Sequence, residues 1–344
     1  MASGSFRWQS MKSMPTKRVF ATPVTYADGL YVVGGCDEKG APLDNVEVYD
    51  MSEKEVKWKK LPPMPTKRAG PGVAALKNKI VVIGGVSEAQ NPLDVVEVYD
   101  IEKKEWKKGE SMIEPLLGMS VLVKDGKILV LGGMGKDTNP HDYFFELDID
   151  SEPFKWSRLT GMPTPRYASA TFHIGSDLFV LGGRQGKIPT DVFEVYHFET
   201  RKWEKLPPVP SKRVFPMYVT DDTNIYSLGG LQQPPDLGFS DVCEVFSLEK
   251  KQWKVGTPMP TKRGDMAAGI VGGKVVCAGG LGNTGKPLNV VEAYDPASNT
   301  WTEISNLPTT HCSCACIIFK NRLHVIGGLS LKGPSSCMEA LSYS

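Results

Sequence analysis

Seven tryptophans recur at nearly constant spacing along the 344-residue chain, and this spacing constrains the fold more than any other feature. They are Trp8, Trp58, Trp106, Trp156, Trp203, Trp253 and Trp301, and the intervals between successive ones differ by only a few residues. A Gly-Gly pair begins 26 residues after each one: Gly34 and Gly35, Gly84 and Gly85, Gly132 and Gly133, Gly182 and Gly183, Gly229 and Gly230, Gly279 and Gly280, Gly327 and Gly328. Such a period indicates stacked supersecondary units.

Each repeat contains four short segments with strand signals. The first two are separated by residue pairs that suit a tight hairpin: Asp28 and Gly29, Lys77 and Asn78, Asp125 and Gly126, Gly272 and Gly273, Lys320 and Asn321. The second segment is an apolar run such as Ile80 to Ile83, which is typical of a strand buried on both faces. The third alternates, as in Val46 to Tyr49, and the fourth carries the tryptophan, often beside lysines that discourage edge-to-edge pairing.

Four antiparallel strands in about 49 residues cannot bury their faces alone, so the sequence predicts an all-β, seven-bladed β-propeller. We expect one domain over residues 1–344. The stretch after Gly328, from Leu329 to Ser344, is too short to reach the tryptophan that the repeat requires. The N-terminal stretch through Trp8 completes the count. A strand of about residues 6–11 should therefore join the C-terminal blade near Cys337 to Leu341 and close the ring.

Composition excludes several classes of partner and location. The formal net charge is +1, from 40 Lys and Arg against 39 Asp and Glu, so we expect neither a nucleic acid nor an anionic membrane as partner. No apolar run is long enough to span a bilayer, and Met1 to Trp8 lacks the apolar segment of a secretory signal. The seven cysteines are irregularly spaced, and we expect reduced thiols.

Arginine stands ten residues after the tryptophan in five repeats, at Arg18, Arg68, Arg166, Arg213 and Arg263. Leu116 and His311 occupy this position in the other two. These loops should lie on the same face as the loops that follow Gly-Gly. Guanidinium groups that converge on a concave face suit carboxylates or phosphates, which predicts partner binding. The alternative is structural: each arginine bonds backbone carbonyls or a carboxylate of its blade.

A glutamate on the third strand also recurs, at Glu47, Glu97, Glu146, Glu194, Glu244, Glu292 and Glu339. Because an active site is unique whereas a scaffold repeats, we interpret these carboxylates as buried groups bonded to backbone N–H groups or to an arginine. The same reasoning makes the tryptophans packing residues.

No other motif predicts chemistry. Cys312, Cys314 and Cys316 alternate along one strand, but same-face residues lie about 7 Å apart, which is wide for holding one metal ion. Cys36, just after a Gly-Gly pair, is expected to be an exposed thiol. The five histidines form no HExxH motif, and neither GxSxG nor a Walker A pattern is present. We expect no catalytic residue, no metal and no cofactor.

The order Gly-Gly, Val-x-Glu-Val-Tyr-Asp and Trp resembles the kelch repeat along the whole chain. Finer details are similar to the kelch domain-containing protein 8 family, among them Leu117 to Ser120, Gly182 to Lys187 and Ala278 to Asn283. The resemblance implies a cytoplasmic, non-catalytic interaction protein, with one branch of the family tied to the midbody and cell division. It also implies that the five arginines hold an acidic peptide, as in kelch substrate adaptors. A kelch-type enzyme, such as a sugar mutarotase using the axial pocket, is the alternative.

We therefore predict a monomeric scaffold that binds a protein or peptide partner through its variable loops. The longest, Leu231 to Ser240, is expected to expose Phe239. Met134 to Asp142 and Arg184 to Thr190 are the next most distinctive, and Arg184 is a further candidate contact. Variable loops on a rigid scaffold are where binding specificity normally resides.

Overall fold

The computed structural model describes residues 4–344, and in that part every regular element is a strand except the short 3₁₀ helix η1(Pro235–Leu237). No helix within residues 4–344 has the length and apolar character needed to cross a bilayer. The chain forms two compact units: a central unit, Phe20–Leu206, and a terminal unit, Met1–Val19 with Pro207–Ser344. Together they contain seven four-stranded antiparallel sheets, the predicted blades of a β-propeller. That they form one domain stays a prediction.

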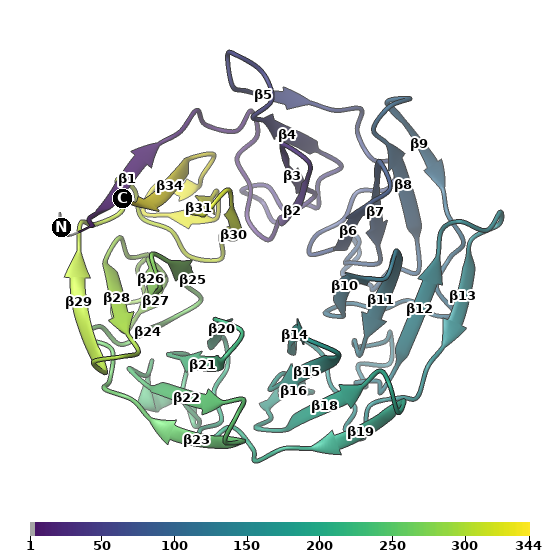
Figure 1. Ribbon diagram of the computed structural model, residues 1–344. Coiled ribbons are helices and arrows are strands. Elements are labelled where there is room, and N and C mark those ends of the chain that lie inside the picture. The colour runs from purple at the N-terminus through teal and green to yellow at the C-terminus, as the bar shows by residue number, and fades with distance from the viewer. Residues whose placement is uncertain (1–3) are drawn as a thin grey trace. The chain divides into compact units, whose positions relative to one another are not determined.

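The central unit contains the first four blades (Figure 1). Blade 1 is β2(Thr22–Tyr26), β3(Gly29–Val33), β4(Val46–Asp50) and β5(Lys57–Lys60), and blade 2 is β6(Gly72–Leu76), β7(Lys79–Ile83), β8(Val96–Asp100) and β9(Glu105–Lys108). Blade 3 is β10(Ser120–Lys124), β11(Lys127–Leu131), β12(Phe144–Asp148) and β13(Lys155–Arg158). Blade 4 is β14(Ala170–Ile174), β15(Asp177–Leu181), β18(Phe193–His197) and β19(Lys202–Lys205), with the small hairpin β16(Arg184–Gln185) and β17(Ile188–Pro189).

The terminal unit contains the other three blades. Blade 5 is β20(Met217–Thr220), β21(Asn224–Leu228), β22(Cys243–Ser247) and β23(Gln252–Val255). Blade 6 is β25(Ala267–Val271), β26(Lys274–Ala278), β28(Val291–Asp295) and β29(Thr300–Ile304), with the short pair β24(Arg263–Gly264) and β27(Leu281–Gly282). Blade 7 is β30(Ala315–Phe319), β31(Arg322–Ile326), β34(Met338–Tyr343) and β1(Phe6–Ser10), with the short pair β32(Leu329–Ser330) and β33(Gly333–Pro334).

The first strands of neighbouring blades contact each other, β2 with β6 and β6 with β10 in the central unit, β20 with β25 and β25 with β30 in the terminal unit. The second strands are the most buried. In β7 every residue from Ile80 to Ile83 has none of its surface exposed, as an apolar run predicts. The tryptophan strands form the opposite edge of each sheet.

The hairpin turns between the first two strands follow the sequence signals at four of the five predicted pairs. At Lys77 and Asn78, for example, φ is 49° and 58°, as a tight two-residue turn requires. The prediction of Asp28 and Gly29 as a turn is wrong by one residue. Tyr26 pairs with Gly29 across the strands, so the turn residues are Ala27, at φ 48°, and Asp28.

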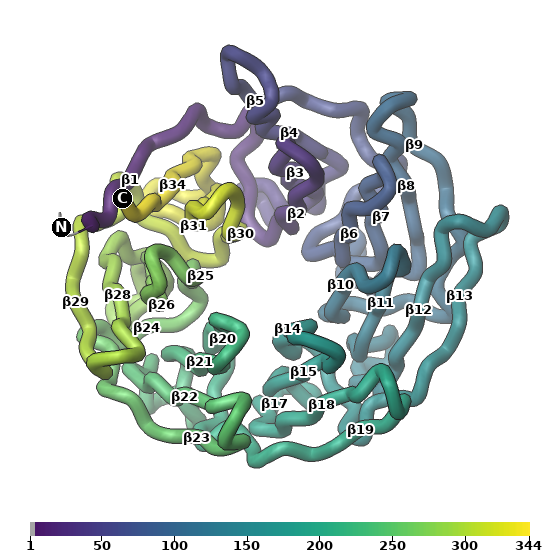
Figure 2. Tube along the Cα trace, in the orientation of Figure 1, coloured from purple at the N-terminus to yellow at the C-terminus, as the bar shows by residue number. Residues whose placement is uncertain are grey.

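Blade 7 combines both ends of the chain, as the repeat count predicted. β1 pairs antiparallel with β34, with Phe6 opposite Tyr343, Trp8 opposite Leu341 and Ser10 opposite Glu339. The backbone N–H groups of Met11 and Met14 extend this pairing by bonding to carbonyls of the Met338 and Ser336 backbone. The tube in Figure 2 shows the purple start and the yellow end of the terminal unit side by side.

The tryptophans link neighbouring blades through a repeated hydrogen bond. The indole Nε1–H donates to a backbone carbonyl that follows the outer strand of the preceding blade, at 2.7 Å from Trp203 to Thr160 and 3.0 Å from Trp156 to Glu110. The Trp203 ring also packs 5.1 Å from Tyr196 of its own blade and 5.8 Å from Phe144 of blade 3. The indole thus joins two blades by packing and by a hydrogen bond.

Trp203→Ala should lower the free energy of unfolding by about 3–5 kcal/mol, because it opens a cavity between blades 3 and 4 and leaves the Thr160 carbonyl without its donor. Chemical denaturation measures this loss. The matched control is the exposed neighbour, Lys202→Ala, whose effect should stay within about 0.5 kcal/mol. A loss below about 1 kcal/mol for Trp203→Ala would show that the indole is not packed as described.

Deleting residues 1–14 should cripple folding, because β34 then loses its partner strand and Met14 its buried site in the terminal unit. We expect the melting temperature to fall by at least about 10 °C, since each kcal/mol is worth about 2–4 °C in a unit of this size. Adding a synthetic peptide of residues 4–14 should restore part of the loss. A truncated monomer with unchanged melting temperature would contradict the pairing.

Candidate functional site

The five repeated arginines lie inside the blades rather than on a surface. Arg68, Arg166 and Arg263 are 0% exposed, Arg18 is 1% and Arg213 is 5%. The Arg166 guanidinium donates to the carbonyls of Gly182 at 3.1 Å and Val192 at 2.6 Å, and to the Glu194 carboxylate at 2.9 Å. These carbonyls belong to the Gly-Gly loop of the same blade.

The same arrangement recurs in the neighbouring repeats. Arg263 donates to the carbonyls of Gly279 and Val290 and pairs with Glu292 at 2.8 Å, while Arg213 pairs with Glu244 at 3.0 Å. Arg68 pairs with Glu97 in blade 2. Burial lowers the pKa of the Arg68 guanidinium, and the Glu97 carboxylate opposes that shift. The sequence left two interpretations of these arginines open, partner binding and a structural role. The geometry corresponds to the structural role, because a guanidinium enclosed in its blade has no surface to offer a ligand.

The turn that accepts the hydrogen bond from the arginine requires two glycines. Gly84 and Gly85 have φ of 58° and 100°, a left-handed region that other residues adopt at a cost. A Cβ on Gly85 would also lie 2.8 Å from the carbonyl oxygen of Ala69. The pair therefore turns the chain tightly enough to aim the Gly84 carbonyl at the Arg68 guanidinium, 3.0 Å away.

Blade 3 replaces the ion pair with an apolar pair. Leu116 stands at the arginine position and is 0% exposed. The strand register places Phe145, which lies opposite Val130 and is 2% exposed, where the other blades have glutamate. The interpretation of Glu146 as the repeated glutamate is therefore wrong by one residue. Its side chain faces the other side of β12 and pairs with Lys127 at 2.8 Å.

Blade 7 keeps the carboxylate but changes its partner to histidine. His311 is 0% exposed, and its Nδ1 lies 2.6 Å from the Gly327 carbonyl oxygen while its Nε2 lies 2.5 Å from Glu339. The imidazole thus spans the same two acceptors, a glycine carbonyl and a glutamate, as the guanidinium does elsewhere.

Two expectations about exposed residues are wrong. Phe239 is only 9% exposed, because the loop of blade 5 folds back: Leu231 and Phe239 form a β-bridge, and the Phe239 N–H donates to Asn283 at 2.7 Å. The exposed large apolar side chain of that loop is Leu237, at 57%. Cys36 is 8% exposed, because its backbone forms a β-bridge with Pro42 and the loop folds over it. Burial raises the pKa of its thiol.

The remaining candidates are placed as follows. Arg184 is half-buried, with its guanidinium 5.8 Å from the Tyr167 ring. Cys312 is buried, and Cys314 and Cys316 are half-buried and pack against the same core cluster; only Cys316 lies within β30. Among residues 4–344, no group of three histidine, cysteine, aspartate or glutamate side chains has the geometry to hold a metal ion.

Sequence reasoning missed the residue two positions after the arginine. It has a positive φ, between 46° and 64°, in every blade: Phe20, Gly70, Gly118, Ala168, Phe215, Asp265 and Ser313. Five of these side chains are small or polar, but Phe20 and Phe215 are 58% and 54% exposed. An alignment of the seven repeats on the arginine position would have revealed the two phenylalanines among small or polar residues.

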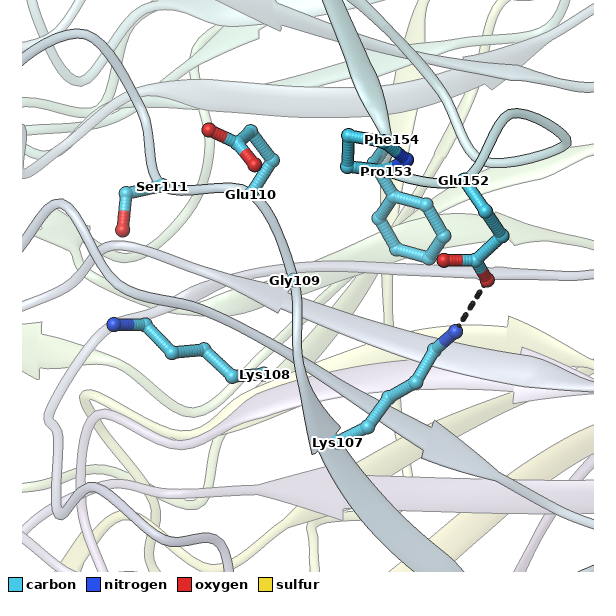
Figure 3. Close-up of a pocket in the computed structure, with 8 residues that line it drawn as sticks. All are labelled: Lys107, Lys108, Gly109, Glu110, Ser111, Glu152, Pro153 and Phe154. Atoms are coloured by element: carbon cyan, nitrogen blue, oxygen red, sulfur yellow. Dashed lines mark hydrogen bonds and ion pairs between the residues drawn. The ribbon is translucent and has the colours of Figure 1, made fainter.

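A groove of about 320 Å³ lies at the outer edge of blade 2, between the end of β9 and the loop before β13 (Figure 3). Figure 3 shows Lys107 reaching Glu152, at 2.6 Å, and its ammonium also lies 5.0 Å from the Phe154 ring. The charge that faces the aromatic wall is thus already neutralised within the protein, so the groove does not indicate an anion site.

The apolar residues of blade 3 allow the buried Arg68–Glu97 pair of blade 2 to be tested directly. Arg68→Leu or Glu97→Phe alone should cost about 3–5 kcal/mol of stability, because each leaves one charge buried without its partner. The double variant, which copies Leu116 and Phe145 into blade 2, should recover at least half of that loss. Chemical denaturation of the four proteins measures the coupling. Additive losses in the double variant would contradict a paired role.

Comparisons with known proteins agree with this architecture. Residues 118–328 match the KLHDC2/KLHL20/DRC7 Kelch-repeats domain, and residues 17–65 and 67–113 match the Kelch motif. Kelch domain-containing protein 8B from Rattus norvegicus and from Homo sapiens are each 39% identical over 167 residues, 46% of this chain and 47% of theirs. Kelch-like protein 40 from Xenopus tropicalis is 29% identical over 176 residues, 49% of this chain and 28% of its own.

The chain thus spans about half the length of the 8B relatives that it matches. A solved structure, "Structure of YjhT", superposes with a TM-score of 0.67 at 16% identity, covering 85% of this chain and 99% of that one, and supports the fold alone. The resemblance to the kelch domain-containing protein 8 family is confirmed. With more than half of its length matched by one family description, the chain belongs to the kelch-repeat β-propellers.

Proposed function

We propose that this protein is a non-catalytic scaffold that binds a partner protein through the loops that follow Gly-Gly, together with the loops that precede each first strand. The observation that carries the proposal is the exposure of large apolar side chains at the tips of these loops. Ile188 in the central unit is 70% exposed, and Leu237 and Leu331 in the terminal unit are 57% and 62% exposed. Exposed apolar groups raised on rigid loops are typical of interaction surfaces.

Bridges between the two kinds of loop support one continuous surface in each unit. Val214 pairs with Leu231 in blade 5, and Cys312 pairs with Leu329 in blade 7. In the central unit Tyr167, before the first strand of blade 4, pairs with Arg184, which lies in the same hairpin as Ile188. The partner contacts are therefore assigned to loop tips and Arg184, in place of the buried arginines.

The acidic-peptide hypothesis depended on exposed guanidinium groups at Arg18, Arg68, Arg166, Arg213 and Arg263, all of which are 5% exposed or less. The proposal therefore includes no acidic segment bound at these five arginines. Cytoplasmic residence and a role at the midbody are part of the proposal, on the similarity to the kelch domain-containing protein 8 family. Imaging the tagged protein through cell division tests that part.

Leu237→Asp combined with Leu331→Asp should weaken partner binding at least tenfold, about 1.4 kcal/mol, while the melting temperature stays unchanged. Affinity capture, followed by titration of the captured partner, measures the effect. The matched control is Val255→Asp, because Val255 is 75% exposed but lies on the outer strand β23. Equal loss in the control, or full affinity in the double variant, would place the interface elsewhere.

A further inference from the structure

A cavity of about 430 Å³ lies between blades 3 and 4 of the central unit. Its lining includes residues of the hairpin turn between β10 and β11 and of the turn between β18 and β19. In a four-stranded antiparallel blade these two kinds of turn lie at the end opposite the Gly-Gly turn. The volume falls in the range of small-ligand sites, about 300–1,000 Å³. The cavity is therefore separate from the loops that we propose as the partner surface.

The floor of the cavity is apolar. It is formed by Leu129 of β11, Leu159 after β13 and Phe198 after β18, and all three side chains pack in one core cluster. The centre of the Phe198 ring lies 5.2 Å from that of Tyr196 and 4.4 Å from the Nζ atom of Lys124. These contacts fix the floor within the fold, so a ligand meets a surface that is already formed.

The charged groups of the wall are paired, with one exception. Lys124 pairs with Asp125, and Lys127 pairs with Glu146 at 2.8 Å. Arg201 also lines the cavity, and within residues 4–344 its guanidinium forms neither an ion pair nor a hydrogen bond. The wall thus has three cations against two carboxylates, and the excess positive charge belongs to Arg201.

The charged wall is specific to blade 3. Glu146 lies on the same face of β12 as Phe144, whose ring centre is 5.0 Å from that of Tyr196 in blade 4. The other six blades have valine or alanine at this position of the third strand: Val48, Val98, Val195, Val245, Ala293 and Ala340. A carboxylate on a face that the repeat otherwise keeps apolar is not explained by the scaffold.

Tyr196 and Arg201 present two hydrogen-bond donors with no acceptor between them. In blade 6 the same two positions are Tyr294 and Asn299, and the Tyr294 hydroxyl donates to the Asn299 side-chain oxygen at 2.7 Å. In blade 4 an arginine replaces that acceptor, and the Tyr196 hydroxyl forms no hydrogen bond to any residue from 4 to 344. Burial raises the pKa of this hydroxyl, and the nearby Arg201 charge opposes the shift. A ligand with two oxygens can satisfy both donors.

On these grounds we propose that the cavity binds the carboxylate of a small apolar acid, either a free molecule or the end of a peptide chain. The Arg201 guanidinium donates to both carboxylate oxygens, which its planar geometry matches, and the Tyr196 hydroxyl donates to one of them. The apolar body of the acid packs on Leu159 and Phe198. The site does not depend on the proposed function, because it uses the other end of the blades.

The test titrates the full chain with phenylacetate and with acetyl-Gly-Gly-Phe, which ends in a free carboxylate, and follows each by ligand-observed NMR. We expect a dissociation constant on the order of 1 mM for at least one of them. Phenylacetamide and the amidated peptide lack the charge and should bind at least about tenfold more weakly. Binding of the peptide indicates a chain end as the ligand, and binding of phenylacetate alone indicates a free acid. No binding of either acid at about 10 mM would overturn the proposal.

Two variants connect the binding to the two donors. Arg201→Gln should weaken binding of the acid at least about tenfold and Tyr196→Phe about threefold. Both should melt within about 2 °C of the wild type, because neither group has a partner in the described fold. The matched control is Lys104→Gln, which removes a cation from the same turn position of blade 2 and should bind normally.

Full affinity in Arg201→Gln, or an equal loss in Lys104→Gln, would overturn the site. The result is also distinguishable from a failure of the proposed function. If the partner still requires Leu237 and Leu331 while neither acid binds, the proposed function stands and this site does not.

Discussion

The buried bond between an arginine, a glutamate and the carbonyl of the Gly-Gly turn holds blades 2, 4, 5 and 6 together, and the other parts of these blades are arranged around it. It connects the loop before the first strand, the turn after the second strand and the beginning of the third strand. Taking a guanidinium and a carboxylate out of water costs several kcal/mol for each ion, so the geometry must supply both the charge pairing and the hydrogen bonds. The left-handed φ of the glycines is what turns a carbonyl toward the guanidinium.

Blade 3 shows that this interaction determines geometry more than it provides stability. Leu116 and Phe145 fill the same space with no charge, in the same core cluster as Val98 and Val130 of blades 2 and 3. A buried ion pair is often replaceable by packed apolar residues, provided that both partners change together. Blade 7 has a third arrangement, in which His311 lies between the Gly327 carbonyl and Glu339, so the arginine position accommodates three kinds of side chain.

Long-range periodicity made most of the fold predictable. Tryptophan and Gly-Gly spacing gave the strand count and the pairing of β1 with β34, because a repeat of fixed length leaves little freedom. The errors are local. A one-residue register shift moved Glu146 to the opposite face of β12, and a fold-back that depends on Asn283, 44 residues away, buried Phe239. Neither effect has a short-range sequence signal. The arginines were placed in the right loops, but their burial depends on partners far along the chain, such as Val95 for Arg68 and Glu194 for Arg166.

The pairing of β1 with β34 also has a consequence for synthesis on the ribosome. β1 and its partner strand lie at opposite ends of the chain, so the edge of β1 stays unpaired while blades 1 to 6 emerge and can fold in turn. Folding from the N-terminus therefore cannot complete blade 7, which forms only after Tyr343 has left the exit tunnel. Until then the nascent chain carries an exposed strand, Phe6–Ser10, of the kind that chaperones protect from aggregation.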